Sequence, residues 1–459
     1  MIDFQPEIPI LPATADRTVG RVAAVRNDPW SADICDEFRR RGYDVLALPP
    51  YRHVPAHLQR RAEVHLAFSA ALARRIRELG GIDYLLAPNG DGIVLLEDAG
   101  RLRTLGDALG VPTIAWWFDD PRLGIHALVE LGILLVYPFL TMLRSAGIHH
   151  YMLDRAMAAE FGRGGFFPHV RHLPVATSAA RFHPPAGVVG RDQALVMVGN
   201  GYSGAGARDY TETNLDVAVH DELLVPLSEL KRTRPRCDFR TLLGQWVAGD
   251  PARRRHHVVR AMEDPWHPAR FNTAYHTWKA NTFLWCELRN QAVRHCQQRF
   301  GPAFRLFGRH WDSLGVTSEG YLAGTHEHRA WYHRSRVGLT CNHGQLQTGL
   351  PFRIWELAAS GIPIVTQDCA ELPDYFKPGE QCAVFGDPPE APEVVERLLA
   401  DQAWRRTLAE RALGRCRAEH LWEHRVQTIV DDLDMPSAAG RNVAASVPSG
   451  SIAPVVGSA

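Results

Sequence analysis

A short glycine-containing loop runs directly into a predicted helix at residues 348–361. Pro351 suits the first position of that helix, and Gly361 lies just past its end. The first turn of a helix presents unpaired N–H groups and the positive end of the helix dipole, which together suit a phosphate. We therefore consider the N–H groups of Thr348 and Gly349 as candidates for binding a diphosphate. The alternative is an ordinary glycine-containing turn.

Two charged side chains follow in the first turns of the same helix. Arg353 and Glu356 lie three residues apart, so they share one helix face. A carboxylate beside an anion-binding helix end suits a nucleoside diphosphate, because the ribose hydroxyls need a hydrogen-bond acceptor. Arg353 either supplies positive charge to the phosphates or pairs with Glu356. Glu356 either accepts from a ribose or is a surface residue paired with Arg353.

These residues must be positioned by β-sheets. The apolar runs of the chain predict two such sheets. The first half alternates apolar runs with helix-like segments at 31–41 and 57–79, and a second alternating series follows a linker near Pro184. Strands alternating with helices predict parallel sheets with right-handed crossovers. The predicted strands are 19–25, 43–48, 82–87, 113–118 and 150–153 in the first half, and 194–199, 304–307, 337–341, 362–366 and 382–385 in the second.

Open parallel sheets bind ligands at the carboxyl ends of their strands, where several loops converge. Gly199 and Asn200 follow the first strand of the second series, and a glycine-rich turn there lets the backbone approach a phosphate. His343 stands at the end of the strand at 337–341. We therefore expect all three residues near the same ligand.

Asp119 and Asp120 end an apolar strand of the first half, at the sheet edge where ligands bind. Adjacent aspartates in this position can serve as a general base, bind a substrate hydroxyl, or cap the segment that follows. The sequence leaves these three roles open. No metal site is predicted, because Asp-x-Asp is missing from the predicted binding segment and the histidines lack metal-ligand spacing. Those histidines are at 326, 328, 333 and 343.

Several of these segments resemble the glycosyltransferases of the GT-B fold. The likeness is closest to the CgeB-like, spore-maturation-type group of the glycosyl transferases group 1 clan, and it covers roughly residues 20–430. The helix segment that carries it reads Phe352-Arg353-Ile354-Trp355-Glu356-Leu357-Ala358-Ala359-Ser360-Gly361. Further matching stretches are 114–121, 173–184, 371–388, 399–406 and 420–426.

The resemblance implies two facing Rossmann-like domains, with an acceptor on the first and a nucleotide-sugar donor on the second. The family's glutamate at the position of Glu356 accepts hydrogen bonds from the donor ribose, and Arg353 would supply charge that a metal supplies in other glycosyltransferases. In related enzymes, the segment that residues 320–322 resemble contacts the nucleobase. Tyr321 therefore either stacks on the base or fills the core. The clan implies retention of configuration, although retaining relatives carry a glutamate where this chain has Thr348.

We therefore expect an α/β protein of GT-B architecture, made of two Rossmann-like domains with parallel sheets. Residues 17–188 are the predicted acceptor-side domain and residues 189–416 the predicted donor domain. A helical insertion is expected at about 205–300 within the donor domain. A closing helix is expected at 417–434, and the tail at 435–459 has a composition typical of disorder.

The expected activity is metal-independent transfer of a sugar from a nucleotide-diphospho-sugar to an acceptor hydroxyl, with no cofactor. The N–H groups at the helix end, either alone or together with Arg353, would stabilise the charge of the departing diphosphate. The turn at 89–92 reads as an acceptor-side turn more than a phosphate loop. Two rivals share the fold: a non-catalytic relative that binds a nucleotide sugar or a partner protein, and a nucleotide-sugar 2-epimerase. The acceptor can be a glycan, protein, lipid or small molecule.

The amino-acid composition argues against some classes of binding partner. The chain has 459 residues with 51 basic and 51 acidic side chains, so no net field favours nucleic acid or an anionic membrane. Eight scattered cysteines without a Cys-x-x-Cys pair, and an N-terminus without a signal-peptide pattern, predict a cytoplasmic location. The most apolar segment, 131–140, falls short of the about 20 residues that a membrane-spanning helix needs. It is either buried or a lipid- or acceptor-facing patch, which leaves peripheral membrane contact open.

Overall fold

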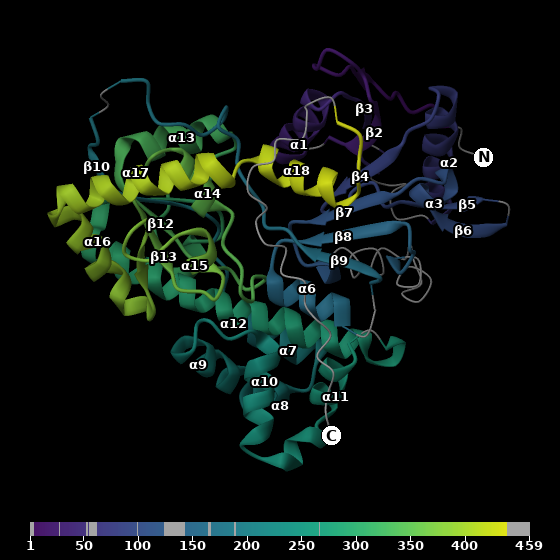
Figure 1. The fold of residues 1–459 in the computed structure, drawn as a ribbon. Coiled ribbons are helices and arrows are strands. Elements are labelled where there is room, and N and C mark those ends of the chain that lie inside the picture. Colours follow the sequence, from purple (N-terminus) through teal and green to yellow (C-terminus); the bar gives the residue numbers. More distant parts are fainter. Residues whose placement is uncertain are drawn as a thin grey trace, which may run out of the picture.

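The computed structural model describes residues 4–26, 28–51, 54, 62–98, 100–123, 143–163, 167–187, 190–265 and 267–437. Two α/β lobes lie side by side, with a group of helices below them in the view of Figure 1. The apolar segment at 131–140 and the tail beyond residue 437 lie outside the described residues. The expectations for both segments therefore stay predictions.

The first lobe is built on a seven-stranded sheet in the order β1-β3-β2-β4-β7-β8-β9. Its neighbouring strands are parallel except β1, which runs antiparallel to β3. The two edge strands β1 and β9 were not predicted, because β1 has only two residues and β9 has a single apolar side chain, Val170. The strands are β1 (Ile10–Leu11), β2 (Gly20–Val25), β3 (Tyr43–Leu48), β4 (Tyr84–Pro88), β7 (Thr113–Trp117), β8 (Ile148–Met152) and β9 (His169–His172).

Helices and one hairpin connect these strands. The first helix begins at Pro29, two residues before the predicted start at 31, because Asp28 caps it. The Asp28 carboxylate accepts hydrogen bonds from the N–H groups of Trp30 and Ser31 at 2.8 and 2.9 Å. The elements are α1 (Pro29–Arg40), α2 (Ala62–Glu78), α3 (Leu105–Leu109), α6 (Arg155–Gly162) and the hairpin of β5 (Leu95–Asp98) with β6 (Arg101–Thr104).

The second lobe is built on a five-stranded, fully parallel sheet in the order β11-β10-β12-β13-β14. Its strands match the five predicted apolar runs, because a parallel sheet covered on both faces selects near-continuous apolar sequence. They are β10 (Gln193–Val198), β11 (Phe304–Phe307), β12 (Ser335–Thr340), β13 (Ile364–Gln367) and β14 (Ala383–Phe385). The accompanying helices are α13 (Thr325–Arg334), α14 (Arg353–Ala359), α15 (Leu372–Tyr375), α16 (Ala391–Ala400) and α17 (Gln402–Glu419).

The predicted helical insertion forms its own apolar core below the lobes (Figure 1). Its last helix also belongs to the second lobe, because Ala292, Val293 and Cys296 pack with the strands of that sheet. A single helix therefore connects the insertion core with the donor-side sheet. The helices are α7 (Ala205–Asn214), α8 (Val217–Val219), α9 (Val225–Thr233), α10 (Phe239–Ala248), α11 (His257–Glu263) and α12 (Pro268–Phe300).

The last helix, α18 (Trp422–Asp432), returns from the second lobe and lies beside α1 (Figure 1). The Trp422 ring packs edge-on against Trp116 of β7, with centroids 5.4 Å apart. The Arg41 guanidinium donates to the carbonyl oxygen of Glu423 at 2.7 Å. The chain end thus ties the two lobes together.

His150 gives the first lobe a buried titratable group. Its Nδ1 accepts a hydrogen bond from the Trp117 indole at 3.1 Å, and its Nε2 lies 3.0 Å from the Leu143 carbonyl oxygen. Burial lowers the pKa of His150 to about 3. As pH falls below about 6.5, the unfolded chain therefore binds a proton here before the folded chain does, and stability is lost.

We expect His150→Gln to weaken this acid sensitivity. The unfolding temperature of the wild type should fall as the pH is lowered from about 6.5 to about 5. In the variant this fall should be smaller, by the contribution of about one bound proton. Part of the slope should remain, because burial also lowers the pKa of His65 to about 4 and of His420 to about 2. Thermal unfolding at stepped pH measures both slopes. Equal slopes would show that His150 does not contribute.

Candidate active site

The strand order of the second sheet reverses at β10. The strand that follows, β11, lies on one side of β10, and β12 returns to the other side, so the loops leaving β10 and β12 diverge. Such a switch point, at the carboxyl ends of the strands, is where open α/β sheets bind ligands. Gly199 and Asn200 follow β10, and His343 follows β12. The structure therefore brings three predicted residues to one sheet edge.

The turn after β10 is held against the loop after β11. The Trp311 indole donates to the Gly199 carbonyl oxygen at 2.7 Å, and the Asn200 side-chain oxygen accepts from the Arg309 N–H at 3.0 Å. Gly308 has φ +144, and a Cβ there would overlap the Gly199 carbonyl. Only glycine permits this approach, which fixes the backbone at the switch point.

Arg289, on α12, places a buried positive charge under this turn. Its side chain donates to the Asn200 carbonyl oxygen, and its guanidinium carbon lies 5.7 and 5.6 Å from the rings of Tyr202 and Trp311. The residue is only 5% exposed, its Nε has no hydrogen-bond partner, and no carboxylate of the described residues forms an ion pair with it. A buried charge without a counter-charge costs several kcal/mol. The site is therefore poised for an anion.

His343 and Asn342 line the other side of the switch point. Burial lowers the pKa of His343 to about 4, with a further contribution from the charge of Arg289, so the imidazole is neutral near pH 7. The side-chain oxygen of Asn342 is buried without a hydrogen-bond partner. Around Arg289, these side chains supply neutral hydrogen-bonding groups rather than a counter-charge.

The predicted diphosphate amides bind a carboxylate of the other lobe. One oxygen of Asp154, at the start of α6, accepts from the N–H groups of Gln347, Thr348 and Gly349, each at 2.8 Å. Asp154 is fully buried, and burial, together with the neighbouring Glu371, raises its pKa. Three convergent amides form an anion cradle, as expected, but the anion is the protein's own. A phosphate would have to displace Asp154 to bind there.

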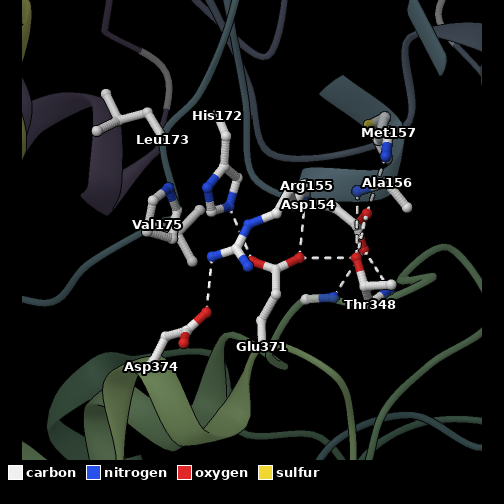
Figure 2. A network of polar contacts seen from close by, with 12 residues as sticks. Asp154, Arg155, Ala156, Met157, His172, Leu173, Val175, Thr348, Glu371 and Asp374 are labelled. Atoms are coloured by element: carbon white, nitrogen blue, oxygen red, sulfur yellow. Dashed lines mark hydrogen bonds and ion pairs between the residues drawn. The ribbon is translucent and has the colours of Figure 1, made fainter. Parts of the chain in front are cut away.

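A second carboxylate completes this joint between the lobes. Figure 2 shows Thr348 between Asp154 and Glu371, with its hydroxyl 3.1 Å and 2.7 Å from their oxygens. Glu371 also accepts from the Arg155 N–H at 2.8 Å, and His172 lies 2.9 Å from its other oxygen. Burial raises the pKa of Glu371, but His172 and the hydrogen bonds outweigh it and leave the pKa lowered. Thr348 thus contacts two buried carboxylates, one from each lobe.

The insertion reaches the same joint through Gln347. Its carbonyl oxygen accepts from Lys231 Nζ at 3.0 Å, and its side chain contacts Glu160 of α6 and the Phe239 N–H at 3.0 and 3.3 Å. Burial lowers the pKa of Lys231 to about 8. Gln347 therefore connects both lobes and the insertion, and the loop at 347–349 works as a structural joint.

Glu356 lies in a closed network inside the second lobe. It is 0% exposed, and its carboxylate accepts from Arg353 and from the Tyr332 hydroxyl, the latter at 3.0 Å. His328 lies 3.7 Å away. Burial raises the pKa of Glu356, but Arg353 and these neighbours lower it overall. The predicted pairing with Arg353 is present, although not at the surface. A ribose would have to replace Tyr332 or Arg353 as donor, and the ribose role stays a prediction.

The two aspartates after β7 have different surroundings. Asp120 is buried and binds Arg122 through both oxygens, at 2.8 and 2.5 Å, and it also accepts from the Arg122 N–H. This is the capping role that the sequence left open. Asp119 is partly exposed and accepts from the side chain of Asn89 at 2.8 Å. Asp119 alone of the pair keeps a carboxylate available for chemistry.

Tyr321 lies on the surface of the second lobe. It is 56% exposed, so the alternative that it fills the core is wrong. The Arg309 guanidinium lies 4.2 Å from its ring centre, and the Arg309 N–H binds Asn200 at the switch point. An exposed aromatic ring beside this turn suits a nucleobase.

We expect Tyr321→Ala to weaken binding of a nucleoside diphosphate by about 1–3 kcal/mol, the usual contribution of one base stacked on an aromatic ring. Tyr321→Phe, which keeps the ring, should bind as the wild type does. Calorimetric titration of UDP and GDP into the three proteins measures this difference. Unchanged affinity in the alanine variant would exclude Tyr321 from the base site.

Comparisons with known proteins identify a family for part of the chain. The sequence at 288–431 matches a family described as "Glycosyl transferase-like". The matched residues begin within α12, just before Arg289, and include β11 to β14 and α14. The predicted glycosyltransferase is thereby confirmed, and the CgeB-like group stays a prediction.

Solved structures show a similar fold over almost the whole chain. Sucrose-phosphate synthase from Thermosynechococcus elongatus matches with TM-score 0.51 and 12% identity, over 91% of this chain and 98% of that one. This likeness concerns the fold alone, and it confirms the predicted GT-B architecture. Anabaena Alr3699/HepE in complex with UDP-glucose gives TM-score 0.46 and 10% identity over 91% and 100% of the two chains. No curated protein matches the sequence.

The described residues contain neither a helix suited to crossing a membrane nor a cluster of metal-binding side chains. None of the described helices combines the length and apolarity that crossing a membrane requires. Among the same residues, no three His, Cys, Asp or Glu side chains are grouped as a metal ion would need.

Proposed function

We propose that this enzyme transfers a sugar from a nucleotide-diphospho-sugar to an acceptor hydroxyl, with the diphosphate bound at the switch point between β10 and β12. Arg289 carries the proposal. It is a buried guanidinium that pairs with no carboxylate of the described residues, and it contacts Asn200 at the sheet edge where this sheet type binds ligands. A diphosphate supplies the missing charge, and a guanidinium suits phosphate geometry.

Arg289 would act most strongly as the donor bond breaks. Negative charge builds up on the departing diphosphate oxygen, and a preorganised cation in a water-poor site stabilises that charge. The fixed backbone of Gly199 and Asn200 would hold the phosphates close to it. We therefore propose a metal-independent reaction in which a guanidinium meets the diphosphate charge.

Other side chains near the same sheet edge would supply the remaining contacts to the donor. Tyr321 would stack on the base, and His343 would offer a neutral hydrogen-bonding group beside the phosphates. Arg353 is partly exposed, so it can also approach the donor while it holds Glu356. The acceptor would enter from the first lobe, where Asp119 lies.

The proposal also covers the group to which the enzyme belongs and the compartment in which it works. The segments at 352–361 and 420–426 support a CgeB-like enzyme. All eight cysteines are unpaired, which suits a reducing compartment such as the cytoplasm.

A donor panel tests the proposal. UDP-glucose, UDP-N-acetylglucosamine, GDP-mannose and TDP-rhamnose are screened by thermal shift, since a ligand stabilises only a folded state that binds it. Release of nucleoside diphosphate is then measured for each. We expect stabilisation and release, including slow hydrolysis without acceptor, for at least one donor. Binding without release would indicate the non-catalytic alternative, and interconversion of donors would indicate the epimerase.

A further inference from the structure

Asp119 is held in place by one side chain from a neighbouring strand end. Asn89, after β4, donates from its amide nitrogen to a carboxylate oxygen of Asp119 at 2.8 Å. The Asn89 side-chain oxygen accepts from the backbone N–H groups of Asp119 at 2.9 Å and Phe118 at 3.2 Å. Both the backbone and the carboxylate of Asp119 are thus oriented by a single amide group.

The turn that presents Asn89 adopts a sparsely populated conformation. Asn89 has φ +54 and Gly90 has φ +77, and a Cβ on Gly90 would overlap the Trp117 ring. Asparagine tolerates the left-handed region better than other side chains, yet the surroundings must hold it there. Backbone conformations of this kind concentrate at functional sites. The geometry around Asp119 is therefore specified in detail.

Asp119 also faces the donor-side loop. Its pKa is raised by burial, while hydrogen bonds from Asn89 and from Gln345 lower it in part. Gln345 stands two residues after His343, in the loop that leaves β12, and its side-chain oxygen accepts from the Asp120 N–H at 3.3 Å. Asp119 therefore lies where the first lobe meets the loop that leaves β12, which also carries His343.

Five other carboxylates described above for this site are engaged, each by a cation, a histidine or several N–H groups. Asp119 is partly exposed and forms no ion pair with a described residue. The five engaged carboxylates are Asp120, Asp154, Glu160, Glu356 and Glu371.

We propose that Asp119 is the general base of an inverting transfer and that Asn89 is its positioning residue; this rests on the proposed function. The acceptor hydroxyl oxygen forms a bond to the anomeric carbon as the bond from that carbon to the diphosphate oxygen breaks. The hydroxyl proton passes to Asp119, and the electron pair of the broken bond goes to the diphosphate beside Arg289. One displacement of this kind inverts the configuration. This proposal differs from the retention that the resemblance implies, and that expectation stays a prediction.

Hydrolysis tests the stereochemistry without a known acceptor, because water then takes the place of the hydroxyl. UDP-glucose and GDP-mannose, both α-linked, serve as probes, and proton NMR identifies the sugar anomer released before mutarotation. We expect the β anomer from whichever probe is cleaved. Release of the α anomer would overturn the proposal of inversion.

Variants test the two residues. Asp119→Asn should lower kcat by about 10²–10⁴-fold, the usual contribution of a general base, without changing the affinity for UDP. Asn89→Gly, which keeps the positive φ but removes all three side-chain hydrogen bonds, should lower kcat at unchanged KM and shift the acid limb of the pH–rate profile. Asp36→Asn, which affects only a surface ion pair with Arg39 on α1, is the control and should change neither.

The outcomes separate this inference from the proposed function. Wild-type kcat in Asp119→Asn, with release intact, would overturn the inference alone. An Asn89→Gly variant with the wild-type pH profile would remove the positioning role. No release from any donor of the panel would overturn the proposed function, and this inference with it.

Discussion

Replacing Arg289 with methionine is expected to lower the rate of nucleoside diphosphate release by about 10²–10³-fold, the effect of removing one preorganised charge-stabilising group. The affinity for UDP should fall as well. The folded protein without ligand should be as stable as the wild type, or more so. Methionine can pack between Tyr202 and Trp311 without the cost of an uncompensated buried charge. Release assays, calorimetry and thermal unfolding measure the three quantities.

The combination of lost activity and preserved stability distinguishes a ligand-binding arginine from a structural one. Arg299, on the same helix, pairs with Glu396 at the surface and is the matched control. Arg299→Met should change neither release nor stability by more than about 1 kcal/mol. An Arg289→Met variant that releases diphosphate at the wild-type rate, or that unfolds far more readily, would contradict the assignment.

Asp154→Ala should produce the largest loss of stability. The substitution leaves the N–H groups of Gln347, Thr348 and Gly349 without their shared acceptor, inside the buried joint between the lobes (Figure 2). Removing one partner of a buried charged network typically costs about 3–5 kcal/mol. We therefore expect a marked fall of the unfolding midpoint and earlier proteolysis in the segments that join the lobes.

Asp374 provides the control within the same network. It pairs with Arg155 at 2.7 Å, but both side chains are about half exposed, so Asp374→Ala should cost at most about 1 kcal/mol. If both alanine variants unfold at the same temperature, the 347–349 loop does not join the lobes. Added UDP should stabilise Asp154→Ala as much as the wild type, because the proposed diphosphate site is elsewhere.

Regular elements could be predicted because their signals are local. The run at 113–118 became β7 (Thr113–Trp117), and the run at 194–199 became β10 (Gln193–Val198). A strand buried on both faces needs consecutive apolar side chains, and sequence shows these directly. The same reasoning correctly placed Gly199, Asn200 and His343 at one sheet edge, since they follow neighbouring parallel strands.

Charge partners could not be predicted, because they depend on packing between distant segments. Asp154 binds amides 193 to 195 residues further along the chain. Arg289 lies within a long helix, and nothing in its local sequence shows that it is buried away from every carboxylate of the described residues. The N–H groups of Thr348 and Gly349 were predicted to bind a diphosphate, but in the structure they bind Asp154.

A crystal structure of the protein with UDP tests the central claim most directly. The account predicts that the diphosphate oxygens lie within hydrogen-bond distance of the Arg289 guanidinium and of the backbone at Gly199 and Asn200, with Asp154 still bound to the 347–349 amides. Diphosphate bound to those amides in place of Asp154, or no nucleotide at the β10–β12 edge at saturating UDP, would contradict it.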